Sequence, residues 1–188
     1  MFNCIRVQLS VQIYKNIAFL YQRCAHKTTY DPSTEKIWLF GGKGATTRLA
    51  DTFSFDLKSL SWTYHSENTS KITPRSFHEI TNDNGKIYVH GGRDDFNKHL
   101  GDIVQIHPEF KQIESDVKIG NHMVFSIKNS KCYVYGGSSD FNPDYGCCDK
   151  FYDDLHIGTI QNDNKKAKFE ESPTKKVRED LESSKIEA

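Results

Sequence analysis

Short apolar runs separated by polar turn residues occupy the middle of the chain. Three of these runs, at 37–40, 87–90 and 132–135, are preceded by clusters of Asp, Asn, Ser, Gly or Pro. Four or more apolar residues bounded by such turn formers are typical of β-strands. Each run also ends at a pair of glycines, which permits the positive φ angles that side chains disfavour. The pattern predicts three strands that leave their sheets abruptly, at Gly41 and Gly42, Gly91 and Gly92, and Gly136 and Gly137.

The surroundings of the glycine pairs repeat as well. The pairs begin at positions 41, 91 and 136, which are 50 and 45 residues apart. A His lies upstream of each pair, and an Asp opens another predicted strand downstream of each pair. Self-similarity at such a period indicates a repeat architecture. We expect three antiparallel units of four strands, marked by His26, His78 and His122 and by Asp51, Asp102 and Asp153.

These units resemble the kelch repeat, in which a Gly-Gly pair follows an apolar strand and precedes an Asp-led aromatic strand and a spaced Trp. The first unit has all of these features, including Trp62. The second unit lacks the Trp, and the third has a long insertion before Asp153. The resemblance covers about 23–157 and implies an all-β fold of propeller blades. The residues that carry it are Gly41, Gly42, Trp62, Gly91, Gly92, Gly136 and Gly137.

The blade model assigns further roles. The Arg-x-x-His segments, Arg23 to His26 and Arg75 to His78, are expected on the innermost strands. Each Arg is expected to reach carbonyls of the next blade. The third unit has Ile119 at the Arg position.

The predicted organisation has three parts. Residues 1–22 form a strand-like segment, 23–160 form the repeat region with blades at about 23–65, 75–115 and 119–160, and 161–188 form a charged, disordered tail. Closed propellers usually have four to eight blades, so three units predict an incomplete or open ring. Three explanations stay open: a fragment of a longer kelch protein, a degenerate fourth blade from residues 1–22 and the tail, or self-association that completes a ring.

Composition and charge narrow the classes of function. The 188 residues contain 25 basic and 25 acidic side chains, and this balance argues against a nucleic acid partner. No apolar stretch reaches the length of a membrane span, so we expect no membrane partner. The five cysteines show no Cys-x-x-Cys spacing, which favours free thiols and a cytoplasmic or nuclear location. A mitochondrial location is the alternative if the acid-free residues 1–29 are a presequence.

The longest predicted loops join the second and third strands of each unit. They run over 43–50, 93–101 and 138–152, and alternation of strand direction places all three at the same end of the blades. Long loops on a rigid scaffold commonly carry binding. We therefore expect a binding face made of Lys43, Arg48, Arg93, Asp94, Asp95, Lys98, His99, Phe141 and Tyr145.

No catalytic or metal-binding motif emerges. The segment 140–144 begins like a calcium loop but lacks the Gly and Glu that such a loop requires at its sixth and twelfth positions. The sequence predicts no catalytic residue, no metal and no cofactor. The resulting hypothesis is a eukaryotic, non-enzymatic scaffold or adaptor that binds a protein partner. The alternatives are a small propeller enzyme or sugar-binding protein that uses its central channel, with His26, His78 and His122 around it, and a non-functional fragment.

Overall fold

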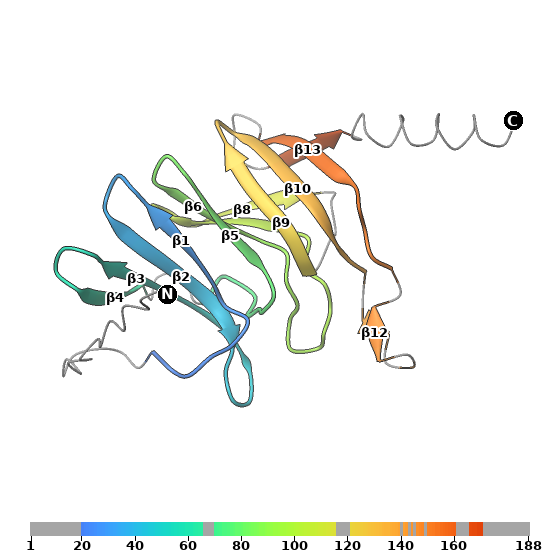
Figure 1. Cartoon of the computed structure of the whole chain (residues 1–188), viewed down its shortest axis with the longest axis horizontal. Helices are drawn as coiled ribbons and strands as arrows, with labels where there is room; N and C mark the ends of the chain where they lie inside the picture. The colour runs from blue at the N-terminus through green and yellow to red at the C-terminus, as the bar shows by residue number, and fades with distance from the viewer. Residues whose placement is uncertain are drawn as a thin grey trace, which may run out of the picture.

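The computed structural model describes residues 20–65, 70–115, 121–139, 141–142, 144, 146–148, 150–160 and 166–170. All regular structure in these ranges is β (Figure 1). The first unit contains β1 (Lys27–Asp31), β2 (Lys36–Lys43), β3 (Arg48–Asp56) and β4 (Ser61–His65). The second contains β5 (Glu79–Asp83), β6 (Lys86–His90), β7 (Ile103–His107) and β8 (Lys111–Ser115). The third contains β9 (Asn121–Lys128), β10 (Lys131–Ser138), β13 (Leu155–Ile160) and β14 (Lys166–Glu170), with a small hairpin of β11 (Phe141–Asn142) and β12 (Cys147–Cys148) inserted.

Each unit is an antiparallel sheet in which strands consecutive in the repeat pair with each other. Polar side chains close the tight turns locally. The Asp31 carboxylate accepts hydrogen bonds from Ser33 and Thr34 after β1, and Asp56 accepts two backbone N–H bonds after β3. Such side-chain-to-backbone bonds are why Asp and Asn favour turns. The predicted all-β fold of four-stranded kelch-type blades is confirmed.

The glycine pairs occupy the crowded positions that the sequence predicts. All six have positive φ angles, for example 57° at Gly41 and 102° at Gly42. A Cβ added at Gly41 would lie 2.9 Å from the carbonyl oxygen of Arg75 in the next blade. A Cβ added at Gly42 would lie 2.8 Å from the carbonyl oxygen of Cys24. Only glycine combines this backbone conformation with these close approaches.

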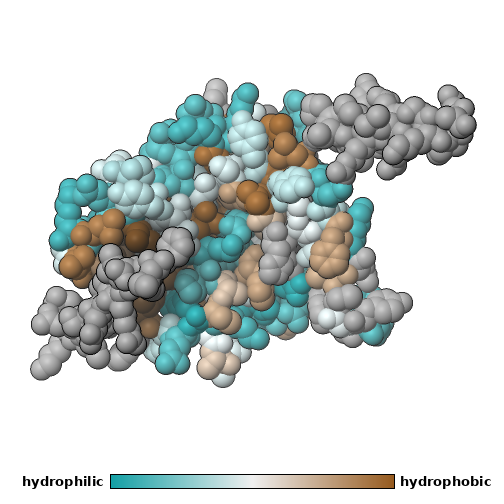
Figure 2. Space-filling model, in the orientation of Figure 1, coloured by the Kyte–Doolittle hydropathy of each residue, from teal (hydrophilic) through white to brown (hydrophobic). Residues whose placement is uncertain are grey.

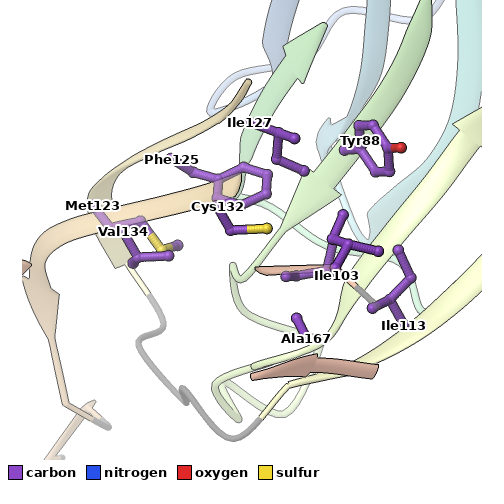
Figure 3. Close-up of a cluster of buried hydrophobic side chains, with 10 residues drawn as sticks. Tyr88, Ile103, Ile113, Met123, Phe125, Ile127, Cys132, Val134 and Ala167 are labelled. Carbon is purple, nitrogen blue, oxygen red and sulfur yellow. The ribbon is translucent and has the colours of Figure 1, made fainter. Parts of the chain in front are cut away.

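Two apolar cores join the three blades. The first lies between blades 1 and 2, where Trp38 and Phe40 of β2 pack with Ile80, Val89 and Val104. The second lies between blades 2 and 3 and contains the side chains in Figure 3, including Tyr88, Phe125 and Val134. Period-two alternation in each strand sends one set of side chains to each face. The middle blade therefore contributes to both cores.

The third blade extends beyond the expected boundary at residue 160. Lys166–Glu170, in the segment that the sequence assigns to the tail, forms β14 and pairs antiparallel with β13. The reason is packing, since Ala167 is fully buried in the second core and Phe169 lies against it. β14 also pairs in parallel with β8 through Lys166–Glu114 and Ala167–Ser115. Blades 2 and 3 thus share one eight-stranded, barrel-like sheet rather than two separate ones.

The strand expected in residues 1–22 falls almost entirely outside the described residues, as do residues 171–188 of the expected tail. A search of the described residues finds no helix with the length and apolar character needed to cross a membrane.

Candidate interaction face

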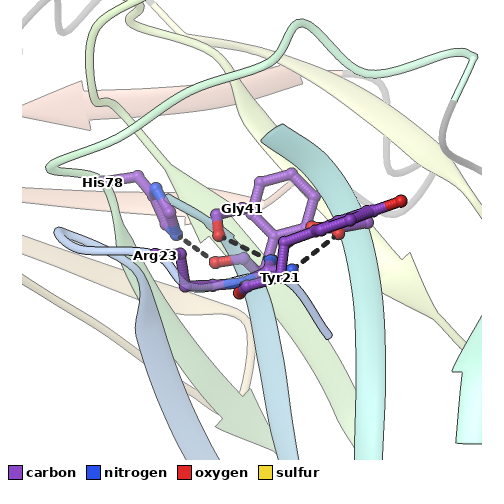
Figure 4. A network of polar contacts seen from close by, with 6 residues as sticks. Tyr21, Arg23, Gly41 and His78 are labelled. Carbon is purple, nitrogen blue, oxygen red and sulfur yellow. Dashed lines mark hydrogen bonds and ion pairs between the residues drawn. The ribbon is translucent and has the colours of Figure 1, made fainter. Parts of the chain in front are cut away.

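The repeated Arg residues brace the inner edge of each blade. Arg75 is fully buried and forms two hydrogen bonds with the Asp102 carboxylate, at 2.8 and 2.9 Å. It also donates to the carbonyl of Gly91, at 3.1 Å. Arg23 repeats this arrangement with Asp51 and the carbonyl of Gly41 (Figure 4). The expectation that each Arg side chain reaches the next blade is therefore wrong, because both bind their own blade.

The bonds that do cross between blades 1 and 2 come from the backbone next to these Arg residues and from His78. The carbonyl of Arg75 accepts from the N–H of Gly42, and the N–H of Arg75 donates to Leu49. His78 Nε2 donates to the carbonyl of Phe40 at 3.1 Å (Figure 4). Burial, with a contribution from the Arg75 charge, lowers the pKa of His78 to about 3. Burial likewise lowers the pKa of His90 to about 4. Both imidazoles are therefore neutral, structural groups at neutral pH.

The loops between second and third strands lie at one end of the molecule. In Figure 1, the loop after β2 and the hairpin strand β12 are at the lower edge, whereas the β9–β10 turn is at the upper edge. The described strands make the first loop shorter than expected, because β2 ends at Lys43 and β3 begins at Arg48. The second loop spans 91–102 and the third spans 139–154.

Arg48 connects the first loop to the second. Its guanidinium donates to Ser76 Oγ and to Asn97 Oδ1, each at 2.8 Å, and its backbone N–H donates to the Asp95 carboxylate at 2.8 Å. Only 8% of Arg48 is exposed. The side chain that the sequence places on the binding face therefore braces that face from beneath.

Arg93 connects the second loop to the third. Its guanidinium donates to Cys148 Sγ at 3.1 Å and lies 5.9 Å from the centre of the Phe77 ring. Arg93 also pairs through its backbone with Ser76 and His99. Phe141 belongs to the β11 backbone in the third loop, and Tyr145 lies outside the described residues. The two arginines thus assemble the three loops into one continuous face.

Among the remaining predicted residues, the acidic side chains accept hydrogen bonds within the loops, whereas the basic side chains of the two lysines are exposed. Asp94 accepts two backbone hydrogen bonds from its own loop, and Asp95 accepts the bond from Arg48. Lys43 and Lys98 are exposed. The structure brings these residues to the predicted end of the molecule, and their role in binding stays a prediction.

Phe96 is not among the residues that the sequence predicts for the binding face. This side chain is 91% exposed at the tip of the second loop, between Asp95 and Asn97. The sequence does contain a signal for an exposed aromatic side chain here. Phe96 has polar neighbours and lies in a loop that is predicted to be long. Whether such a ring folds back or projects depends on the loop backbone, which the sequence pattern does not define.

Elsewhere the visible surface is mainly hydrophilic. In Figure 2 the apolar residues on this side form separate patches, one of them over the β3–β4 end. Among the residues that the structure describes, no group of three or more His, Cys, Asp or Glu side chains is arranged to hold a metal ion. The side chain of His122, part of the alternative with a central histidine cluster, lies outside the described part of the chain.

Repeated four-stranded blades, glycine pairs at their inner ends and loops gathered at one end define a propeller-type repeat protein. The family model described as the KLHDC2/KLHL20/DRC7 Kelch-repeats domain matches residues 8–178. This match covers most of the 188 residues, so the chain belongs to the kelch-repeat family. The resemblance seen in the sequence is confirmed. Kelch-repeat domains generally mediate protein–protein interactions and are typically non-enzymatic.

Proposed function

We propose that this chain is a scaffold or adaptor that binds a protein partner through the face formed by its β2–β3, β6–β7 and β10–β13 loops. The observation that carries the proposal is the bracing of these loops by Arg48 and Arg93. Loops held in one geometry lose less conformational entropy when they bind, which favours affinity. Six residues that the sequence predicts for this face remain as candidate contacts: Lys43, Asp94, Asp95, Lys98, His99 and Phe141.

The test needs variants that change the face without unfolding it. Arg48 is unsuitable because it is buried, whereas Lys43 and Lys98 are exposed and can be reversed to Glu together. The matched control reverses Lys128 and Lys131, two exposed residues at the β9–β10 turn. This turn is at the opposite end of the molecule (Figure 1).

A random peptide library displayed on phage supplies the ligands. Peptides selected on the wild-type chain are measured by fluorescence polarisation against both double variants. We expect Lys43→Glu with Lys98→Glu to weaken binding by about tenfold or more, with the control unchanged. Equal binding to both variants, or a failure to select any peptide, would contradict the proposed face.

A further inference from the structure

Phe96 has the greatest exposed fraction of the large apolar side chains that the structure describes, at 91%. A single exposed apolar residue is ordinary on a protein surface. Phe96 differs because its loop holds it outward in one defined backbone conformation. The hydrogen bonds around it show how this is achieved.

A tight turn forms the base of the loop tip. The Asp94 carboxylate accepts hydrogen bonds from the N–H groups of Phe96 and Lys98, both at 2.9 Å. The Asp94 carbonyl accepts from the N–H of Asn97, and the N–H of Asp94 donates to the carbonyl of Lys98. Asn97 has a φ of 60°, a conformation that Asn tolerates better than most residues. Four hydrogen bonds thus fix the five residues 94–98.

Arg48 then clamps the tip on both sides of Phe96. Its backbone N–H donates to the Asp95 carboxylate, and its guanidinium donates to the Asn97 side chain. Because residues 95 and 97 are both held by the same Arg of the preceding blade, residue 96 between them projects away from the scaffold. Preorganised aromatic side chains have few rotatable bonds to immobilise on binding.

Two exposed lysines lie near Phe96, beside acids whose hydrogen bonds are made within the scaffold. The acids Asp94 and Asp95 are already engaged in hydrogen bonds within the scaffold. Lys98, two residues from Phe96, and Lys43, on the adjoining hairpin, are exposed and make no ion pair with any described residue. The ring is therefore an apolar projection beside available positive charge.

We propose that Phe96 is the anchor of the partner interface, packing into apolar side chains of a protein segment that carries carboxylates toward Lys43 and Lys98. Aromatic anchors that become fully desolvated dominate the energetics of many interfaces. This inference rests on the proposed function and names the residue that dominates it. A protein segment fits better than a lipid surface, because a single exposed ring inserts little apolar area into a bilayer.

The experiment uses the full chain and the same peptides, selected on the wild-type chain. Phe96→Ala is expected to weaken binding at least about tenfold, and Phe96→Trp is expected to restore most of it. Leu60→Ala is the control, because Leu60 is 60% exposed in the β3–β4 turn at the other end of the blades. Asp94→Ala keeps the ring but removes the base of the turn, and it is expected to give a smaller loss.

Three outcomes would overturn the inference. If peptides lose binding to the Lys43→Glu and Lys98→Glu variant but bind Phe96→Ala fully, the face stands and the anchor is wrong. If no peptides are selected, both proposals fail. If Phe96→Ala leaves peptide binding intact but abolishes binding to vesicles of phosphatidylcholine and phosphatidylserine, the ring serves a membrane contact instead.

Discussion

The two contacts between neighbouring blades are built differently. Blades 1 and 2 keep separate sheets and are joined by an apolar core plus hydrogen bonds from the repeated Arg-x-x-His segment, at Arg75, Phe77 and His78. Blades 2 and 3 share a sheet through the parallel pairing of β8 with β14. The Asp83 carboxylate adds two bonds to backbone N–H groups of the β9–β10 turn.

The difference follows the repeat motif. In the second repeat, Arg75 is bonded to Asp102 and to the Gly91 carbonyl, and the backbone groups of Arg75 and Phe77 bond to blade 1. The third repeat has Ile119 at that position, and strand pairing at the opposite edge accompanies the change. In the part of the chain that the structure describes, the first contact uses the Arg-x-x-His segment and the second uses strand pairing.

The largest effect on stability is expected from a substitution at Arg75. Arg75→Met removes a fully buried guanidinium and leaves the Asp102 carboxylate, 21% exposed, without its partner. We expect the free energy of unfolding to fall by about 4 kcal/mol, since breaking a buried ion pair leaves one charge uncompensated. Urea denaturation followed by tryptophan fluorescence measures the change.

Two controls sharpen this result. Arg75→Lys keeps the positive charge but cannot form two parallel hydrogen bonds with the Asp102 carboxylate. We therefore expect a loss of stability smaller than that of Arg75→Met. Lys98→Met removes an exposed charge and should change stability by less than about 0.5 kcal/mol. A loss of stability below about 1 kcal/mol for Arg75→Met would mean that the pairing of Arg75 with Asp102 is not needed to hold the edge of blade 2.

Acid is expected to weaken both contacts. His78 bonds across the first, and the ring of His90 lies 4.9 Å from Phe125 in the second. Their pKa values of about 3 and about 4 lie below the ordinary value of 6.5. Between the folded and unfolded pKa values the unfolded chain binds more protons, so stability is present above about pH 6.5 and is lost as the pH falls.

Between about pH 7 and about pH 5, we expect each His to lower the free energy of unfolding by roughly 2 kcal/mol. His78→Gln keeps a donor for the Phe40 carbonyl and removes the titrating group, so it should flatten this dependence by about half. Urea midpoints measured across the pH range test it. An unchanged slope in His78→Gln would assign the acid sensitivity to other groups.

The smallest effect is expected at Gly158 of β13. An added Cβ would lie 2.8 Å from the carbonyl oxygen of Lys168 and 2.7 Å from the Phe169 ring, so Gly158→Ala pushes β14 away. We expect this overpacking to lower the free energy of unfolding by about 2 kcal/mol. Amide hydrogen exchange should accelerate at Lys166–Glu170, with Thr159→Ala, an exposed neighbour, as the unchanged control. Full protection of β14 in Gly158→Ala would show that the strand pairing adapts.

The sequence predicted features that depend on local patterns. The glycine pairs, the turn residues and the alternation within strands identify the blades because each acts over a few neighbouring residues. The pairing of Arg75 with Asp102 was missed, although both residues had been noted, because it joins positions 27 apart. β14 was assigned to the tail because Lys166–Glu170 contains only two apolar residues, and only its packing in the folded chain shows their role.

The candidate site was predicted less completely. Strand alternation was sufficient to place three loops at one end, but the sequence pattern gave Arg48 a contact role that burial argues against. The exposure of Phe96 depends on hydrogen bonds from a residue 48 positions away, which no local pattern contains.

The clamp by Arg48 has a consequence for how such proteins can be recombined. The tip that presents Phe96 belongs by sequence to the second repeat, but two of the residues that shape it take their bonds from the first. The module that would have to be transplanted is therefore larger than one repeat. Moving 91–102 into another kelch scaffold would transfer the amino-acid sequence of the loop. The loop would not keep its conformation unless an Arg equivalent to Arg48 were moved with it.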